Sequence, residues 1–122
     1  MRIRTVTLYL TDVFRSIEKI ERYTFGLTFD EFEKNDLIVD GTVLNLEIIG
    51  EAISNIPKPL LADFPNIEWN RAIGFRHLSA HEYFGLDTEI IWSIVQHRLE
   101  EMKEAVTILI TKSSEMDRGS TV

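Results

Sequence analysis

Apolar residues recur at every third or fourth position along most of the chain, which is the spacing of one face of an α-helix. The pattern predicts a first helix that ends between residues 22 and 25, with Gly26 as its cap. A capping box at Thr28 starts a short second helix, and Asp36 caps a third that ends before Pro57. The stripes are formed by Leu10, Val13, Ile17 and Ile20 in the first helix and by Val39, Val43, Leu46, Ile49 and Ile53 in the third.

Two further helices complete the pattern. A loop or short helical turn over residues 58–65 leads to a fourth helix, which is capped by Asn66 and ended by Gly85. Asp87 caps a fifth and longer helix, whereas residues 111–122 are small, polar and aperiodic. The stripe of the fifth helix is formed by Ile91, Val95, Leu99, Met102, Val106 and Leu109.

These elements predict an all-α fold, an antiparallel bundle of about five helices, because the loops are short and no strand-like alternation persists. Residues 1–110 form the bundle, and residues 111–122 form a flexible C-terminal tail. A surplus of apolar side chains indicates that one face is buried against a partner. These side chains are Phe25, Phe29, Phe32, Phe64, Trp69, Phe84 and Trp92.

Gly41 and Gly50 both lie inside the third helix. A glycine in a helix costs about 1 kcal/mol relative to alanine, so each needs a reason. Close packing against a neighbouring helix is one reason, and approach of a ligand or a partner backbone is the other.

The amino-acid composition excludes or disfavours several classes of function. The chain has 122 residues and no cysteine, which excludes disulfides, thiolate metal ligands and thiol nucleophiles. Its net charge of −7 disfavours loose, non-specific nucleic-acid binding, so any phosphate site must be a local basic patch. No apolar run approaches membrane-spanning length and no leader-like core opens the chain, which predicts a cytoplasmic protein.

The candidate chemistry is concentrated in residues 76–83, which read Arg-His-Leu-Ser-Ala-His-Glu-Tyr. Arg76 supplies a permanent cation with a planar fork of donors. His81 can transfer a proton near neutral pH, and Tyr83 offers a hydroxyl and a stacking face. On an unbroken helix, residues five apart differ by about 140° around the axis. Three arrangements remain open: the helix loosens near Ser79, Arg76 reaches across, or the two residues meet their counterparts in a second chain.

Cleavage of an RNA phosphodiester suits these groups. A base must take the 2′-hydroxyl proton, an acid must protonate the leaving oxygen, and a cation must stabilise the charge that develops on the phosphate. One His81 and one Arg76 per chain are few for this task, but a symmetric dimer supplies two of each in one cleft. The scheme requires no metal or other cofactor, and the sequence has no tight carboxylate cluster to hold a metal.

Each of these residues also has an ordinary structural explanation. Arg76 near a helix end can be a solvated charge, and Tyr83 can belong to the core. His77 and His81 share a helix face and could form half of a zinc site, although no further ligands are evident. Arg71 either extends the basic patch around Arg76 or solvates its own face.

The order of landmarks resembles the HepT family of HEPN proteins. The resemblance rests on residues 46–52 (Leu-Glu-Ile-Ile-Gly-Glu-Ala), Trp69, residues 76–85 and Trp92, and it covers nearly the whole chain. It implies a dimerising helical bundle with the motif Arg, four residues, His, one residue, Tyr at the dimer cleft. It also implies a metal-independent ribonuclease toxin, whose antitoxin MntA, a minimal nucleotidyltransferase, attaches AMP to the motif tyrosine.

Carried over to this chain, the resemblance makes Arg76 the phosphate-binding cation and His81 the general acid or base. Tyr83 becomes the AMP acceptor and an RNA contact, and Arg71 and His77 are further substrate-binding candidates. His77 stands where the family usually has asparagine, so it either adds a proton carrier or weakens activity. A non-catalytic module that binds a nucleotide or the nucleotidyltransferase is therefore the alternative function, and a plain helical dimerisation domain is a third.

Overall fold

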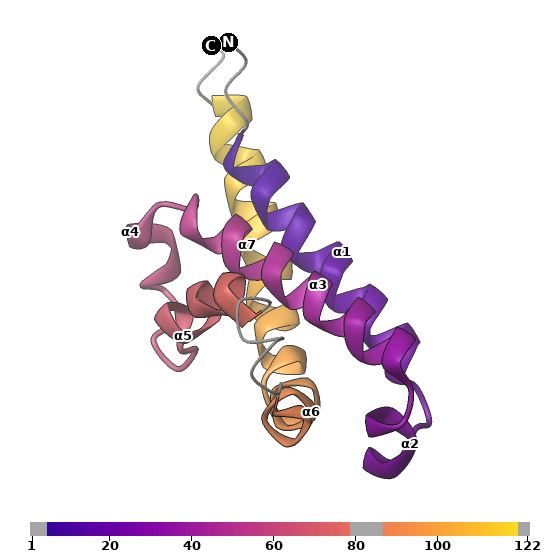
Figure 1. Cartoon of the computed structure of the whole chain (residues 1–122). Helices are drawn as coiled ribbons and strands as arrows, with labels where there is room; N and C mark the ends of the chain where they lie inside the picture. The colour runs from indigo at the N-terminus through magenta and orange to yellow at the C-terminus, as the bar shows by residue number, and fades with distance from the viewer. Residues whose placement is uncertain (1–4, 79–86, 120–122) are drawn as a thin grey trace, which may run out of the picture.

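The structure, a computed structural model, describes residues 5–78 and 87–119, with side chains as far as 115. Within these stretches the chain is helical and contains no β-strand, which confirms the all-α class. Figure 1 shows the longest helices packed together, with the shorter helices around them. The helices are α1 (Val6–Thr24), α2 (Phe29–Glu33), α3 (Asp36–Ser54), α4 (Lys58–Leu61), α5 (Trp69–Gly74), α6 (Thr88–His97) and α7 (Leu99–Gly119).

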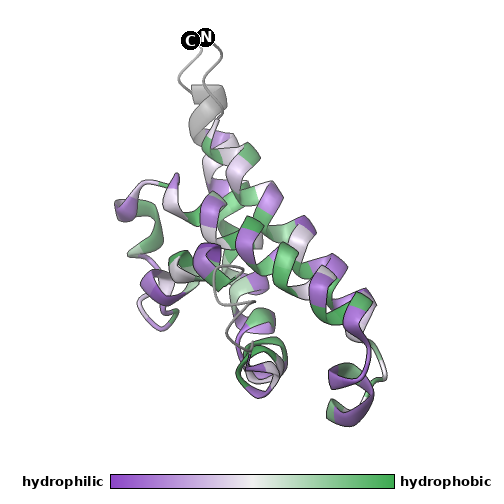
Figure 2. Cartoon of the chain, in the orientation of Figure 1, coloured by the Kyte–Doolittle hydropathy of each residue, from purple (hydrophilic) through white to green (hydrophobic). Residues whose placement is uncertain are grey.

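Helix α1 packs between α3 and α7 and runs antiparallel to α7 (Figure 1). At one end of the pair, the hydroxyls of Thr7 and Ser113 share a hydrogen bond of 2.8 Å. At the other end, Lys103 Nζ donates to Glu21 Oε1 at 2.8 Å. The hydrophobic and hydrophilic bands along α1 and α3 in Figure 2 are those of amphipathic helices, and the predicted stripes of both helices are buried.

The capping predictions are confirmed at Thr28 and Asp87. Thr28 N donates to Glu31 Oε1 at 3.0 Å and Glu31 N donates to Thr28 Oγ1 at 3.2 Å, which is a complete capping box. Asp87 accepts from the first turn of α6. The cap of α3 is wrong by one residue, because Asn35 and not Asp36 accepts from Ile38 N.

The fourth and fifth predicted helices differ most from the structure. Asn66 is not the cap of α5, since Glu68 precedes that helix and makes no side-chain capping bond. Helix α5 ends at Gly74 and continues as a 3₁₀ turn over residues 75–78. The predicted fifth helix is divided at Arg98 into α6 and α7.

The segment predicted to be a tail continues α7. Residues 111–119 are helical, and Ser113 is buried where it meets Thr7. Helix α7 therefore continues past residue 110 as far as Gly119, while the flexibility of residues 111–122 stays a prediction. Small polar residues such as Ser113 suit this position because α1 lies close beside it.

The surplus of aromatic residues is used mostly inside the subunit. Phe32 is fully buried and its ring lies 5.0 Å from that of Trp92, which also contacts Phe29. Trp69 is buried, and its indole nitrogen donates to two backbone carbonyls. Phe25 alone of the described members is largely exposed, at 87%, while Phe84 lies outside the described residues. Phe29, Phe32, Trp69 and Trp92 are therefore explained by contacts inside the chain, while a partner surface stays a prediction.

A different set of apolar residues is exposed on α3. Leu37, Leu44 and Ile48 are 82%, 56% and 38% exposed, and with Gly41 they follow the i, i+4, i+7, i+11 spacing of one helix face. The next position of this face is Glu51. We call Leu37, Gly41, Leu44 and Ile48 the outer stripe of α3.

Candidate functional site

The site is organised by the crossing of α3 and α5 at Gly50. A Cβ atom at Gly50 would lie 2.7 Å from both the Ala72 carbonyl oxygen and the Arg76 backbone nitrogen. These are backbone atoms that cannot move aside easily, so only glycine permits the approach. This confirms close packing as the reason for Gly50, and the contact fixes the start of the 75–78 turn against α3.

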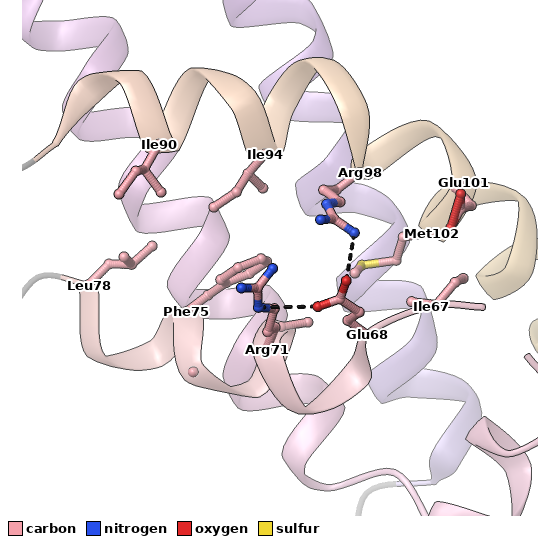
Figure 3. A pocket seen from close by; sticks show the side chains of 12 residues that line it. Ile67, Glu68, Arg71, Phe75, Leu78, Ile90, Ile94, Arg98, Glu101 and Met102 are labelled. Atoms are coloured by element: carbon pink, nitrogen blue, oxygen red, sulfur yellow. Dashed lines mark hydrogen bonds and ion pairs between the residues drawn. The ribbon is translucent and has the colours of Figure 1, made fainter. Parts of the chain in front are cut away.

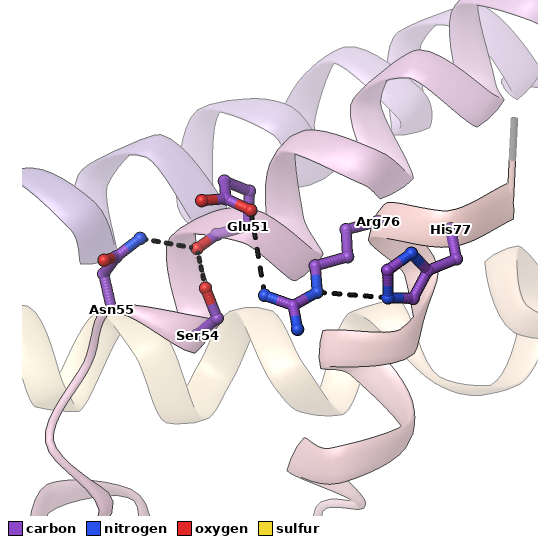
Figure 4. Close-up of polar contacts among 5 residues, drawn as sticks. All are labelled: Glu51, Ser54, Asn55, Arg76 and His77. Carbon is purple, nitrogen blue, oxygen red and sulfur yellow. Dashed lines mark hydrogen bonds and ion pairs between the residues drawn. The ribbon is translucent and has the colours of Figure 1, made fainter. Parts of the chain in front are cut away.

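Arg76 leaves this turn on the side of α3, as Figure 4 shows. Its Nη1 lies 3.9 Å from Glu51 Oε2, and its Nε donates to His77 Nε2 at 3.4 Å. The Arg76 side chain is 40% exposed. A guanidinium with such open access can still present several donors to an incoming phosphate.

His77 meets Arg76 through one ring nitrogen, because its Nε2 accepts the hydrogen bond from Arg76 Nε. His77 is therefore next to the cation and not on another face of the turn. An asparagine at this position would also offer an acceptor, so His77 can replace it in this one contact.

His81 and Tyr83 lie outside the described residues. The convergence of Arg76 with these two side chains, and the predicted helix end at Gly85, therefore stay predictions. The geometry up to residue 78 does change the argument about the helix. Because the α-helix ends at Gly74, the angle of about 140° between residues 76 and 81 on an unbroken α-helix does not apply.

Arg71 is engaged elsewhere, in a cavity of about 590 Å³ between α5, α6 and α7 (Figure 3). Its Nε lies 3.1 Å from Glu68 Oε2, and Arg98 Nη1 donates to Glu68 Oε1 at 3.0 Å. Arg76 and His77 do not line this cavity. Arg71 and Arg76 therefore pair with different carboxylates, Glu68 and Glu51. The apolar wall is formed by Ile67, Phe75, Leu78, Ile90, Ile94 and Met102.

Sequence reasoning missed Glu51 and the Arg98–Glu68 pair. Glu51 follows the glycine at the crossing, and its spacing from Leu44 and Ile48 places it on the outer stripe's face of α3. That spacing was readable from the sequence. Its pairing with Arg76 was not readable, because it depends on the contact between α3 and the 75–78 turn.

The described residues contain neither a metal-binding cluster nor a membrane-spanning helix. Residues 5–78 and 87–115 contain no group of three or more His, Asp or Glu side chains arranged to hold a metal ion. No helix within the described chain has the length and apolar character needed to cross a membrane. His77, one half of the hypothetical zinc pair, instead contacts Arg76.

Comparison with known proteins places this chain in a family. The family model described as "Ribonuclease HepT-like" matches residues 13–109, which include the crossing at Gly50 and the segment 76–83. The chain belongs to the HepT-like family. This confirms the resemblance drawn from the landmark residues.

The names of individual relatives agree with the family match of this HepT-like protein. A protein of Methanocaldococcus jannaschii named "Putative RNase MJ1380" is 33% identical over 109 residues, which are 89% of this chain and all of the relative. The "Probable ribonuclease HepT" of Thermococcus cleftensis is 34% identical over 95 residues, which are 78% of this chain and 86% of the relative. No solved structure matches the chain.

Proposed function

We propose that this HepT-like protein is a metal-independent endoribonuclease toxin that works as a homodimer in the cytoplasm. The main support is the family match over residues 13–109, together with the half-open guanidinium of Arg76 at a backbone contact that only glycine permits. The relatives with RNase or ribonuclease in their names support the activity class. The reaction uses side chains of the protein and no cofactor.

In the proposed reaction, the 2′-oxygen of the RNA attacks the neighbouring phosphorus and the 5′-oxygen of the next nucleotide leaves. A base takes the 2′-hydroxyl proton, and an acid returns a proton to the leaving oxygen. His81 of the two subunits fills these roles, and Arg76 stabilises the charge on the phosphate oxygens. The products are a 2′,3′-cyclic phosphate and a 5′-hydroxyl end.

The outer stripe of α3 is the proposed dimer contact. Its exposed leucines have no partner surface within the described subunit, and the face leads directly to Glu51 beside Arg76. A second copy packed on this stripe would bring two Arg76 side chains to one cleft, because a twofold axis repeats the same surface on both subunits. His77, Tyr83 and Arg71 then contribute contacts to RNA around the cleft.

The proposed toxin is silenced by AMP transfer from an MntA-type nucleotidyltransferase to Tyr83. The added phosphate brings negative charge and bulk to the segment that also contains Arg76 and His81. A phosphodiester held near the guanidinium would occupy the position of the RNA phosphate. The support for this step is the tyrosine two residues after His81, as in the family motif.

The test is cleavage of RNA by the purified protein in the presence of EDTA. Arg76→Ala and His81→Ala should each abolish cleavage, whereas Arg15→Ala, which removes an exposed arginine from α1, should retain it. Persistent cleavage by both site variants would defeat the proposal. If the wild-type protein binds RNA or nucleotide but cleaves no RNA, the result would instead favour the non-catalytic module. The pairing of Arg76 with Glu51 is compatible with that alternative.

A further inference from the structure

Glu51 places a carboxylate beside the cation that is proposed to bind RNA. Its Oε2 lies 3.9 Å from Arg76 Nη1, which is beyond hydrogen-bonding distance but well inside the range of charge attraction (Figure 4). The Glu51 side chain is 66% exposed and the Arg76 side chain 40% exposed. The carboxylate therefore reduces the positive charge that Arg76 presents, without using its donors.

The two charges are held together by backbone packing and not by their own attraction. Ser54 Oγ donates to the Glu51 carbonyl at 2.6 Å and Asn55 Nδ2 donates to it at 2.9 Å, which stabilises the end of α3 around Glu51. Gly50, the preceding residue, contacts the Arg76 backbone nitrogen. Removing the Glu51 charge should therefore leave Arg76 in place.

We infer that Glu51 is a specificity-determining residue that competes with the RNA phosphate for the Arg76 guanidinium. The inference rests on the proposed role of Arg76 as the phosphate-binding cation. A phosphate that contacts the guanidinium must come close to the Glu51 carboxylate, and like charges at such a distance repel. Because both groups are partly exposed, the weakening is modest, about two- to fivefold in affinity.

This competition would favour long RNA over small anions. An anion that contacts only Arg76 gains little binding affinity from that contact while Glu51 is charged. An RNA strand that also contacts other residues of the dimer cleft gains enough to overcome the repulsion. Glu51 thereby limits occupation of the site by inorganic phosphate and free nucleotides.

The test compares Glu51→Gln with Asp40→Asn. Asp40 lies 11 residues earlier on α3, so the two exposed acids share a helix face about 16 Å apart and lose the same charge. All proteins carry His81→Ala to prevent turnover, and fluorescence anisotropy in EDTA gives the Kd for a short single-stranded RNA. Glu51→Gln should bind about two- to fivefold more tightly than its parent, and Asp40→Asn should change the Kd by less.

A double-mutant cycle isolates the pair. The gain from Glu51→Gln should disappear when Arg76→Ala is also present, and inorganic phosphate should compete better against RNA on Glu51→Gln. The inference is overturned if Glu51→Gln binds RNA no more tightly than its parent, or if neither protein binds measurably. It is also overturned if the gain in RNA affinity persists with Arg76→Ala.

Kinetics with His81 restored separates this inference from the proposed activity. Glu51→Gln should lower KM and leave kcat unchanged, because Glu51 is not proposed to act in the chemical step. A fall in kcat would instead make Glu51 part of the chemistry and overturn the inference. If the wild-type protein binds RNA and cleaves none, the ribonuclease proposal fails, while the ratio of Kd values still decides the role of Glu51.

Discussion

Gly50 of α3 contacts the backbone of Arg76, so closely that a Cβ atom would lie 2.7 Å from the Arg76 nitrogen. The contact joins the buried helix α3 to the cation of the candidate site. Stability and the position of Arg76 therefore depend on the same glycine.

Gly50→Ala should destabilise the protein by about 1–3 kcal/mol, because the methyl group meets backbone atoms that cannot move alone. Gly41→Ala is the matched control on the same helix, since its Cβ would meet only the Tyr23 ring, at 3.2 Å. That variant should be nearly neutral or slightly more stable, because alanine favours a helix. Urea unfolding measures both, and equal effects would contradict this account of the crossing.

Leu44→Glu should convert the proposed dimer to a monomer and abolish cleavage, because a charge in the outer stripe of α3 would be buried without a partner in the proposed interface. Ile108→Glu on α7 is the control, since Ile108 is 57% exposed and Leu44 is 56% exposed. Sedimentation equilibrium gives the subunit number. A dimer that persists in Leu44→Glu and dissociates in Ile108→Glu would move the interface to α7.

Arg71→Ala should weaken RNA binding without lowering kcat. Arg71 pairs with Glu68 on a cavity that Arg76 does not line, so its proposed contact with RNA would serve binding and not the chemical step. The affinity should fall by about two- to fivefold, and the slope of log K against log salt should decrease by about one charge. An unchanged salt slope would remove Arg71 from the RNA-binding surface.

Tyr83→Phe should block AMP attachment by the nucleotidyltransferase, because the phenyl ring has no oxygen to accept the nucleotide. Tyr23→Phe is the control, because Tyr23 is a partly exposed tyrosine on α1. Intact-mass and peptide mass spectrometry read the modification. Nucleotide found on Tyr83→Phe protein, at any residue, would overturn the assignment.

The pKa of Glu31 should lie below its ordinary value, because the Thr28 backbone N–H and then the Thr28 hydroxyl donate to its carboxylate. A lowered pKa means that the capping box stabilises the fold above the ordinary carboxyl pKa and loses this contribution as pH falls through the lowered value. Carbon-13 NMR titration measures it directly. Thr28→Ala should raise the Glu31 pKa toward the ordinary value, whereas Thr28→Ser should preserve it.

Local signals were sufficient for much of the fold. The capping box at Thr28 depends on residues three apart, and the buried stripe of α1 depends on simple periodicity, so both could be predicted from the sequence. The break at Arg98 could not, because the apolar spacing continues across it. Arg98 instead reaches Glu68 near α5, which is a tertiary contact.

The sequence motif indicated the candidate residues of the site, but not which side chains lie next to them in the fold. Arg76 was identified from the motif, but its neighbour Glu51 depends on the crossing at Gly50. The outer stripe of α3 was visible in the spacing of Leu37 and Leu44, yet its exposure requires knowing which face α1 covers. Sequence periodicity alone does not distinguish these two faces of α3.

The hydrogen bond between Thr7 and Ser113 has a mechanical consequence. Helices α1 and α7 run antiparallel and meet at this contact, so residues 6 and 115 lie at the same end of the pair. Tension applied between these residues pulls perpendicular to the two helix axes. The two helices would therefore separate one turn at a time, starting at this end. A protein-unfolding motor that pulls on a chain terminus would need little force to begin unfolding at this end of the helix pair.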